Sequence, residues 1–189
     1  MVQITQGGIV FGQPKAHWWD NVPSFDDFVG ANGTSVDSAK WDTVLIAPST
    51  SIAVAEIQSN QGSIRIEESD GTCSATMDLK TALNGGKLIA FITSITTSRY
   101  GDGYVYVGNA IDGWTTVINL ALSDSAINAP TSVEAIYKGS NTWDVYVGNT
   151  KVQTGLTLAN GFKIRFYCYG LNSLIGEKQI SVENVVIQG

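Results

Sequence analysis

The sequence contains very little of what catalytic and metal-binding proteins most often use. Among 189 residues it has one histidine and two cysteines. A Ser-His-Asp or Cys-His mechanism needs a histidine inside the folded domain, and the only one is His17, near the N-terminus. Structural zinc sites need a cluster of histidines and cysteines, which the chain lacks. We therefore expect no enzyme of these classes, no bound metal and no cofactor.

Positive charge is also scarce. The chain has 11 Lys+Arg against 17 Asp+Glu, for a formal net charge of −6, and no cluster of basic residues. Proteins that bind nucleic acid need such a cluster to neutralise phosphates, so nucleic acid is excluded as a partner. Disorder is excluded as well, because 43% of the residues are hydrophobic and only 15% are charged.

Long apolar runs are absent. The longest, from Leu88 to Ile95, is interrupted by Thr93 and Ser94 and falls far short of the roughly 20 residues that a membrane helix needs. We expect no membrane insertion. The first 25 residues contain no apolar segment typical of a signal peptide, so we expect the protein to stay where it is made or to leave by cell lysis.

The two cysteines do not settle the redox compartment. Cys73 and Cys168 lie far apart and form no CxxC pair. A disulfide and two free buried thiols both stay open, since free cysteine is commonly buried in protein cores.

What the sequence does have is alternation with a period of two. Apolar and polar side chains alternate over residues 64–67, 75–79, 133–138 and 164–168. Such segments bury one face of a strand and leave the other in water. In Leu88–Ile95 both faces are apolar, which predicts a central strand covered on its second side. Near Glu183-Asn184 the alternation changes phase, which predicts a β-bulge.

Turn-forming residues separate these segments. They occur at Gly85-Gly86, Gly108-Asn109, Gly148-Asn149 and Asn160-Gly161. These residues tolerate the backbone conformations of tight hairpins. Many short strands joined by such turns predict an all-β protein, an antiparallel sandwich or barrel.

The first 24 residues differ from the rest. Glycines and Pro14 interrupt any strand there, yet the segment is rich in apolar and aromatic side chains. We assign the docking of this arm to Ile9, Phe11, His17, Trp18 and Trp19. Because so many apolar groups are unfavourable in water, we expect residues 1–24 to form an arm that packs on this subunit or on a neighbouring one.

Two motifs carry a family resemblance. Phe25-Asp-Asp-Phe28, followed by Val36-Asp-Ser-Ala-Lys-Trp41, resembles the opening of concanavalin A-like (laminin G-like) domains. The final segment, Val182–Ile187, is similar to the family's last strand, which pairs beside its first. The resemblance covers residues 25–189 and implies an antiparallel jelly-roll β-sandwich. It concerns the fold more than the function, since lectins, glycanases, lyases and structural modules share this fold.

The catalytic residues of these relatives are not matched here. Glycanases of this fold carry an E-x-D-x-x-E strand, and the nearest match, Glu68-Ser-Asp70-Gly-Thr-Cys73, has a cysteine in place of the third carboxylate. Lyases of the fold use a histidine or tyrosine base with arginine and glutamine partners, and His17 lies in the arm. We therefore expect no enzymatic activity.

Calcium stays open as an alternative to ordinary turn acids. Asp102, Asp112 and Asp124 lie in or near expected loops, and calcium binds carboxylate and carbonyl oxygens. Their spacing matches no known calcium loop.

Aromatic residues are the remaining candidates for a functional site. Sugars stack on aromatic rings, while aspartate and asparagine bind their hydroxyl groups. The segment around one expected hairpin supplies this combination, so we predict a glycan site formed by Tyr100, Asp102, Tyr104, Asn109, Asp112 and Trp114. The alternative is that these residues serve as core and cross-strand packing.

The composition indicates a subunit of an assembly. A Ser/Thr/Asn/Gly-rich, Lys-poor β protein without a signal peptide is similar in composition to bacteriophage virion proteins. Our first hypothesis is a non-enzymatic structural protein of a virus particle, a capsid decoration or tail module that docks by its arm on itself or on other virion proteins and contacts host glycans. The alternative is an extracellular carbohydrate-binding module or lectin, and a glycan-active hydrolase or lyase comes third.

Overall fold

A computed structural model describes residues 17–48, 50–68, 71–96, 101–120, 130–170 and 176–189 of the chain. Every regular element in these ranges is a β-strand, so the all-β expectation is confirmed. No helix in the described ranges is long and apolar enough to cross a membrane.

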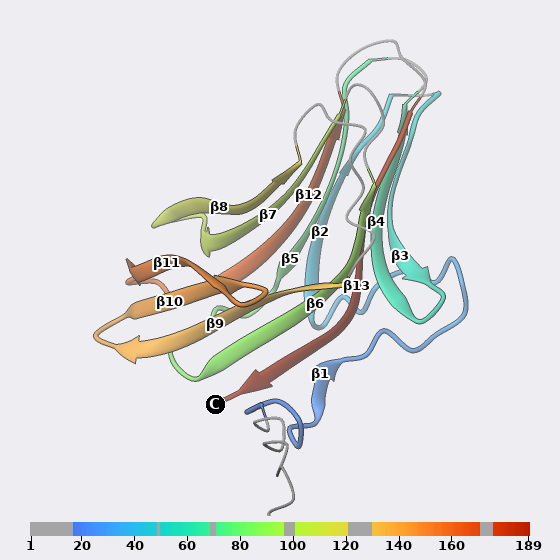
Figure 1. The fold of residues 1–189 in the computed structure, drawn as a ribbon. Helices are drawn as coiled ribbons and strands as arrows, with labels where there is room; N and C mark the ends of the chain where they lie inside the picture. The colour runs from blue at the N-terminus through green and yellow to red at the C-terminus, as the bar shows by residue number, and fades with distance from the viewer. Residues whose placement is uncertain (1–16, 49, 69–70, 97–100, 121–129, 171–175) are drawn as a thin grey trace, which may run out of the picture.

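The strands form two antiparallel sheets packed face to face (Figure 1). The larger sheet has eight strands, of which seven follow one another in the order β11 (Thr150–Thr157), β10 (Thr142–Val147), β9 (Thr131–Gly139), β6 (Lys87–Thr96), β13 (Gly176–Gln188), β4 (Gln61–Glu68) and β3 (Ile52–Gln58). The eighth, β1 (Ser24–Asp26), pairs with β13. The smaller sheet has the order β2 (Trp41–Ile46), β5 (Cys73–Leu79), β12 (Lys163–Gly170), β7 (Gly101–Asn109) and β8 (Gly113–Leu120).

The alternating residues of the sequence form the core between the sheets. Ile64 and Ile66 of the large sheet and Met77 and Phe166 of the small sheet are fully buried, whereas Arg65 between the two isoleucines is only half-buried. Both cysteines are buried and are not joined in a disulfide. Apolar side chains on the facing sides of two sheets thus exclude water, which is the main stabilising term of a sandwich.

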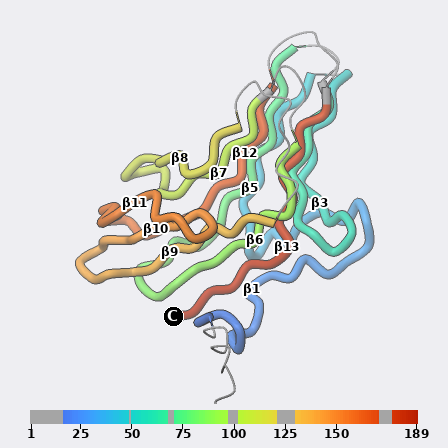
Figure 2. The backbone as a smooth tube through the Cα atoms, in the orientation of Figure 1, coloured from blue at the N-terminus to red at the C-terminus, as the bar shows by residue number. Residues whose placement is uncertain are grey.

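The two special expectations for the large sheet are also confirmed. Leu88 and Ile89, which point to opposite faces of β6, are both fully buried. The pairing of β13 with β6 shifts register between Val182 and Asn184, where the alternation changes phase. The first strand pairs beside the last, as the resemblance implies, and Figure 2 shows the described start of the chain close to its C-terminus.

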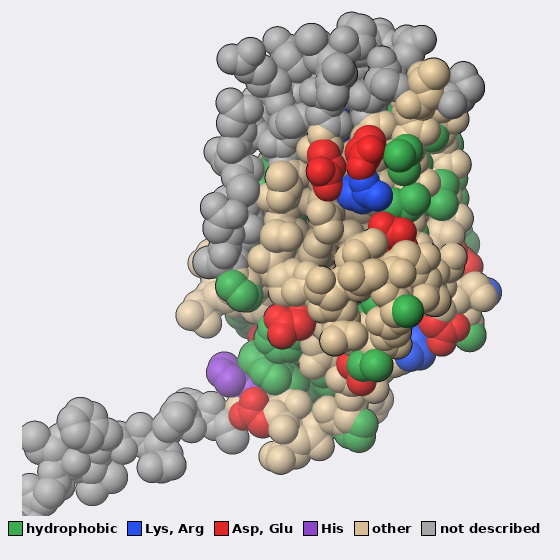
Figure 3. Space-filling view, turned by 90° about the vertical axis from the view of Figure 1, so that its right-hand side faces the viewer, with side chains coloured by type: hydrophobic (Ala, Val, Ile, Leu, Met, Phe, Trp, Pro, Cys, Tyr) green, Lys and Arg blue, Asp and Glu red, His purple; other side chains and the backbone are tan. Residues whose placement is uncertain are grey.

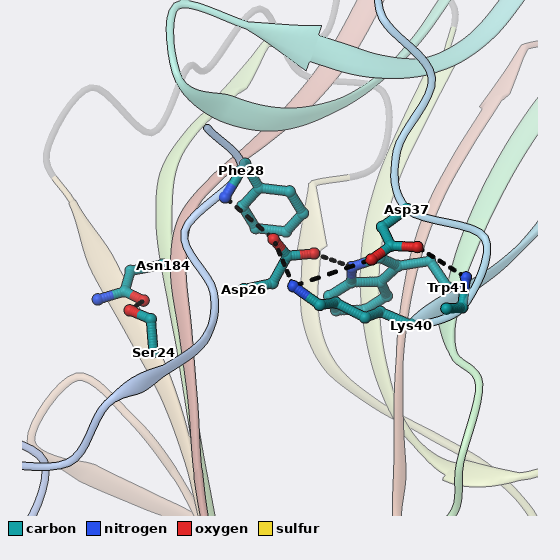
Figure 4. Close-up of polar contacts among 8 residues, drawn as sticks. Ser24, Asp26, Phe28, Asp37, Lys40, Trp41 and Asn184 are labelled. Carbon is teal, nitrogen blue, oxygen red and sulfur yellow. Dashed lines mark hydrogen bonds and ion pairs between the residues drawn. The ribbon is translucent and has the colours of Figure 1, made fainter. Parts of the chain in front are cut away.

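The start of the sandwich is held by a buried carboxylate (Figure 4). The oxygens of Asp26 accept hydrogen bonds from the indole of Trp41 at 2.7 Å and from the backbone N–H of Phe28 at 3.0 Å, and Lys40 lies 3.4 Å away. These partners compensate for the burial of the charge. The Phe-Asp-Asp-Phe motif therefore has a structural role, since its Asp26 connects β1 to the core.

The described part of the arm packs on its own chain. Trp18 donates a hydrogen bond to Glu134 of β9, and Trp19 packs against Phe91 of β6 in a T-shaped arrangement with ring centroids 6.0 Å apart. His17 stacks on Trp19 at 4.1 Å and is exposed, as Figure 3 shows for the purple side chain next to the green ones. Residues 17–19 therefore pack on their own subunit, which is one of the two alternatives expected for the arm. Ile9 and Phe11 lie outside the described residues.

The strands of both sheets are bent, and the smaller sheet lies on the inside of the bend (Figure 1). Its outer face is therefore concave. A concave sheet face is a common place for an extended ligand because side chains from several strands converge on it.

Candidate functional site

Register places the outward side chains of the small sheet in rows that run across the strands. The first row contains Asp42, Asp78, Arg165, Tyr106 and Thr116. The second contains Val44, Thr76, Tyr167, Tyr104 and Asn119. Because side chains alternate across a strand, the buried residues between these positions face the core, and the rows lie on the outer face of the sheet.

Four tyrosines form a continuous layer at the centre of this face. Tyr104 packs against Tyr106 at 5.4 Å and against Tyr167 at 6.0 Å, and Tyr167 packs against Tyr169 at 6.0 Å. In these three pairs the rings lie nearly parallel, with interplanar angles of 23–25°, whereas the rings of Tyr106 and Tyr167 are tilted by 47°. They therefore use their faces mainly on one another and leave ring edges and hydroxyl groups for a ligand.

Three phenol groups of this layer, those of Tyr104, Tyr106 and Tyr167, keep their protons. Burial raises the pKa values of Tyr106 and Tyr167 above the usual range. The pKa of Tyr104 is raised most, first by burial and then by the hydrogen bond that its hydroxyl donates to Asp102 at 2.6 Å. Protonated phenols both donate and accept hydrogen bonds, as a ligand rich in hydroxyl groups requires.

A tryptophan and an arginine form the wall beside the tyrosines. The guanidinium carbon of Arg165 lies 4.0 Å from the ring centroid of Trp114, within the range of a cation–π contact. The same guanidinium binds both oxygens of Asp78, with distances of 2.7 and 2.6 Å. Arg165 is thus held from two sides, which fixes the position of the indole.

A glycine lets the tryptophan reach the arginine. Trp114 on β8 pairs with Gly108 on β7, and Arg165 lies on the next strand, β12. The indole must therefore cross β7 over Gly108, which is buried and has no side chain in the way. Gly108 also has φ +136°, and a Cβ there would lie 2.1 Å from the carbonyl oxygen of Gly113. Only glycine fits this position.

Trp114 stands between two hollows. The larger has a volume of about 540 Å³ and is lined by Val44, Thr76, Tyr106, Trp114, Arg165 and Tyr167. The smaller, of about 180 Å³, is lined by Asp78, Ala82, Asn109, Ala110, Ile111, Trp114, Asn160 and Lys163. Aromatic rings, one guanidinium and several hydroxyl groups around an open hollow are the usual lining of a site for a polar organic ligand.

The structure brings only some of the expected site residues to this face. Tyr104, Asp102 and Trp114 lie on it, whereas Tyr100 is outside the described residues. Tyr104 pairs with Asn119 and Trp114 with Gly108, so the two aromatic residues are on different parts of the hairpin. The strand pairing therefore does not place Tyr104 and Trp114, which the sequence analysis assigned to one site, directly opposite each other.

Asn109 and Asp112 have structural partners instead. Asn109 is 4% exposed and donates hydrogen bonds to Asp112 at 2.8 Å and to the carbonyl of Gly161 at 2.7 Å. Asp112 accepts two further hydrogen bonds from Asn160, and these contacts lower its pKa, that from Asn109 most. The pair closes the β7–β8 turn and joins it to the turn at Gly161.

The expected calcium alternative does not fit the described geometry. Asp102 lies near the start of β7 and Asp112 beyond its end, so a strand of this length separates them by roughly 25 Å. Asp124 lies outside the described residues. Within the described ranges, no group of three His, Cys, Asp or Glu side chains could hold a metal ion.

The described carboxylates of the concave face are all engaged. Asp78 binds Arg165, Asp102 accepts from Tyr104, and Asp42 lies 3.8 Å from Lys80 and 4.0 Å from Lys163. Glu68, the start of the weak glycanase motif, ends β4 in the other sheet. Asp70 lies outside the described residues.

Sequence reasoning missed Arg165, Asp78, Thr76 and Val44 as part of the site. Alternation places Arg165 and Tyr167 on one face of their strand, but nothing local in the sequence indicates which strands lie beside it. Two other aromatic residues lie elsewhere: Trp143 is in the core, and Tyr146 packs under Lys151 on the large sheet.

Comparisons with known proteins identify the fold. No protein family and no curated protein match the sequence. Among solved structures, LamAcat from Zobellia galactanivorans matches with a TM-score of 0.64 and 12% identity over 90% of this chain and 98% of that one. A β-1,3-glucanase from Mycobacterium marinum matches with 0.59 and 12% over 89% and 100%. LamA from Zobellia galactanivorans in complex with laminaritriose and laminaritetraose matches with 0.58 and 10% over 86% and 97%.

These structures span almost the whole chain at low identity, so the likeness concerns the fold. It agrees with the two-sheet topology, the pairing of the first strand with the last and the resemblance of the opening motifs. The chain has the concanavalin A-like β-sandwich fold.

Proposed function

We propose that this protein is a non-enzymatic glycan-binding protein that holds an oligosaccharide on the concave face of its small sheet. The observation that carries the proposal is the hollow of about 540 Å³ lined by Tyr106, Tyr167, Trp114 and Arg165. Its rings supply apolar surface, and its hydroxyl and guanidinium groups supply hydrogen bonds. A sugar offers both apolar C–H faces and hydroxyl groups, which matches this lining.

The fold supports the same proposal. One solved protein of this fold was crystallised with laminaritriose and laminaritetraose. At 10% identity this is support for the ligand class and for no particular sugar.

Among the described residues of the concave face we find no suitable carboxylate pair, which is our reason for proposing binding without catalysis. Glycosidases of the retaining type use two carboxyl groups about 5–5.5 Å apart, one as nucleophile and one as acid. On the described part of the concave face, Asp42 and Asp78 face each other across β2 and β5, but Asp78 has both oxygens bound by Arg165. Incubation with β-glucans, alginates and host polysaccharides should release no reducing ends and no unsaturated products.

A glycan array followed by calorimetry tests the binding. Trp114→Ala should weaken the affinity for a glycan found on the array by about 1–3 kcal/mol, the usual range for an anchoring aromatic residue. Tyr106→Ala should act in the same direction. Tyr146→Ala is the matched control, since this tyrosine lies on the other sheet, and should leave the affinity unchanged. A ligand whose affinity survives Trp114→Ala and Tyr106→Ala together would place the site elsewhere.

A structural role in a virus particle is the second candidate. It is favoured by the apolar residues Ile9 and Phe11, which precede the part of the arm that packs on its own sandwich. Mass spectrometry of purified particles from a lysed host would detect the chain at a stoichiometric level if this is right. Its absence from every particle fraction would count against the role.

A further inference from the structure

Strand β2 forms an open edge of the small sheet. It pairs with β5 on one side, and in the described part of the chain no strand pairs with its other side. Its apolar side chains are unusually exposed: Val44 is 57%, Leu45 46% and Ile46 55% accessible. Exposed apolar edge strands are templates for pairing with another chain, and natural proteins usually protect them with lysine or proline. Residues 43–46 contain neither.

One hydrogen bond shows which backbone groups of β2 point to the free edge. The hydroxyl of Thr76, on β5, donates to the carbonyl of Val44 at 3.3 Å, so this carbonyl points toward β5. Backbone groups of successive residues in a strand point to alternate sides. The N–H and C=O groups of Thr43 and Leu45 therefore point to the free edge, where they need partners.

These groups are complementary to those of a second copy. In an antiparallel pairing centred on Val44, Thr43 of one copy faces Leu45 of the other, and the two exchange N–H···O=C hydrogen bonds. The same arrangement occurs on both sides of Val44, as two-fold symmetry requires.

Charge favours the same pairing. Each chain has a formal net charge of −6, so contact between two copies is unfavourable wherever acidic groups meet. In this register Asp42 faces the uncharged Ile46, and residues 43–46 carry no charge. The edge is thus a part of the surface where two copies meet without repulsion between facing side chains.

We propose that two copies of this chain associate through β2, joining their small sheets into one continuous sheet across a two-fold axis. The occupant of the edge is a second copy. Val44 lines the hollow of about 540 Å³, so in the dimer Val44 of the second copy borders the open side of that hollow. The two concave faces then lie on one side of the joined sheet.

Light scattering over a concentration series tests the dimer with the full chain. The wild type should have twice the mass of one chain and should dissociate on dilution. Leu45→Lys places a charge in the interface, and Leu45→Pro removes the edge N–H that does not bond to β5. Both should shift the protein to monomer. Ile111→Lys is the control, because Ile111 is 78% exposed in the β7–β8 turn and the variant should remain a dimer.

Thermal unfolding of each variant checks that it is folded. If the Leu45→Pro variant does not fold, the result for Leu45→Lys decides the test. A wild type that is monomeric throughout the series overturns the proposal, and so does a Leu45→Lys variant that stays dimeric. If Phe11→Asp dissociates the dimer while Leu45→Lys does not, the arm is the contact and the proposal is wrong. Glycan binding by the monomeric Leu45→Lys variant is a separate readout, so failure of the dimer and failure of the binding function can be distinguished.

Discussion

Arg165 joins Trp114 to Asp78. The indole ring lies 4.0 Å from the guanidinium carbon, and the same guanidinium holds both carboxylate oxygens of Asp78. These contacts connect side chains of three strands, β8, β12 and β5. The position of the tryptophan in the proposed site thus depends on Asp78 through Arg165.

This relationship predicts energetic coupling between Asp78 and Arg165. The side chains are 16% and 29% exposed, so the ion pair is partly shielded from water. A double-mutant cycle with Asp78→Ala and Arg165→Ala should give a coupling free energy of about 1 kcal/mol in urea denaturation. Asp78→Ala should also change the fluorescence of Trp114. Additive single effects would mean that the pair contributes nothing to stability.

The buried carboxylate of Asp26 predicts a large loss of stability on its removal. Asp26→Ala leaves the indole N–H of Trp41 and the N–H of Phe28 without their acceptor, which should lower the free energy of unfolding by about 2–4 kcal/mol. Urea denaturation measures this. Asp27→Ala is the matched control, since the neighbouring Asp27 is exposed, and it should change stability by less than about 0.5 kcal/mol. Equal effects of the two variants would contradict a stabilising role of the contacts that Asp26 makes.

Close packing predicts that a single methyl group at Gly62 is destabilising. A Cβ on Gly62 would lie 2.4 Å from the ring of Phe28, which is 2% exposed and cannot move into water. Gly62→Ala should cost about 1–3 kcal/mol. At Gly85 the nearest atom to an added Cβ is 3.9 Å away, so Gly85→Ala should be tolerated. A thermal shift of the same size for both variants would refute this packing argument.

Asp144 predicts a decrease of stability in acid. Its carboxylate binds Lys151 at 2.8 Å and the N–H of Gly155 at 3.0 Å, and its pKa is lowered, by the lysine most. A carboxyl whose pKa is lower in the folded than in the unfolded state stabilises the fold above its unfolded pKa, about 3.9. That contribution is lost as the pH falls through the folded pKa. In urea denaturation at several acidic pH values, Asp144→Asn and Lys151→Met should each make stability less dependent on pH, and an unchanged pH profile would count against this account.

The sequence by itself determined the class of fold. Alternation in residues 64–67, 75–79 and 164–168 is a local consequence of strand geometry, so it predicts which side chains face the core, and the phase change near Glu183-Asn184 predicts the bulge. The opening motif, Phe25–Phe28, indicated the concanavalin A-like sandwich because it consists of neighbouring residues and can be recognised in the sequence alone. The aromatic side chains Tyr104 and Trp114 were also identified as site candidates.

The tertiary structure alone decided how the site is assembled. Tyr104 meets Tyr167, and Trp114 meets Arg165, through pairings between strands that are distant in the sequence. Periodicity specifies the face of a residue but not the neighbour of its strand, so Arg165 and Asp78 could not be placed in the site. Asn109 and Asp112 have side chains typical of a ligand site. Their partners at Asn160 and Gly161 are distant in the sequence, so only the structure showed that they close a turn. Neighbouring strands are chosen by the packing of two whole sheets, which no short segment encodes.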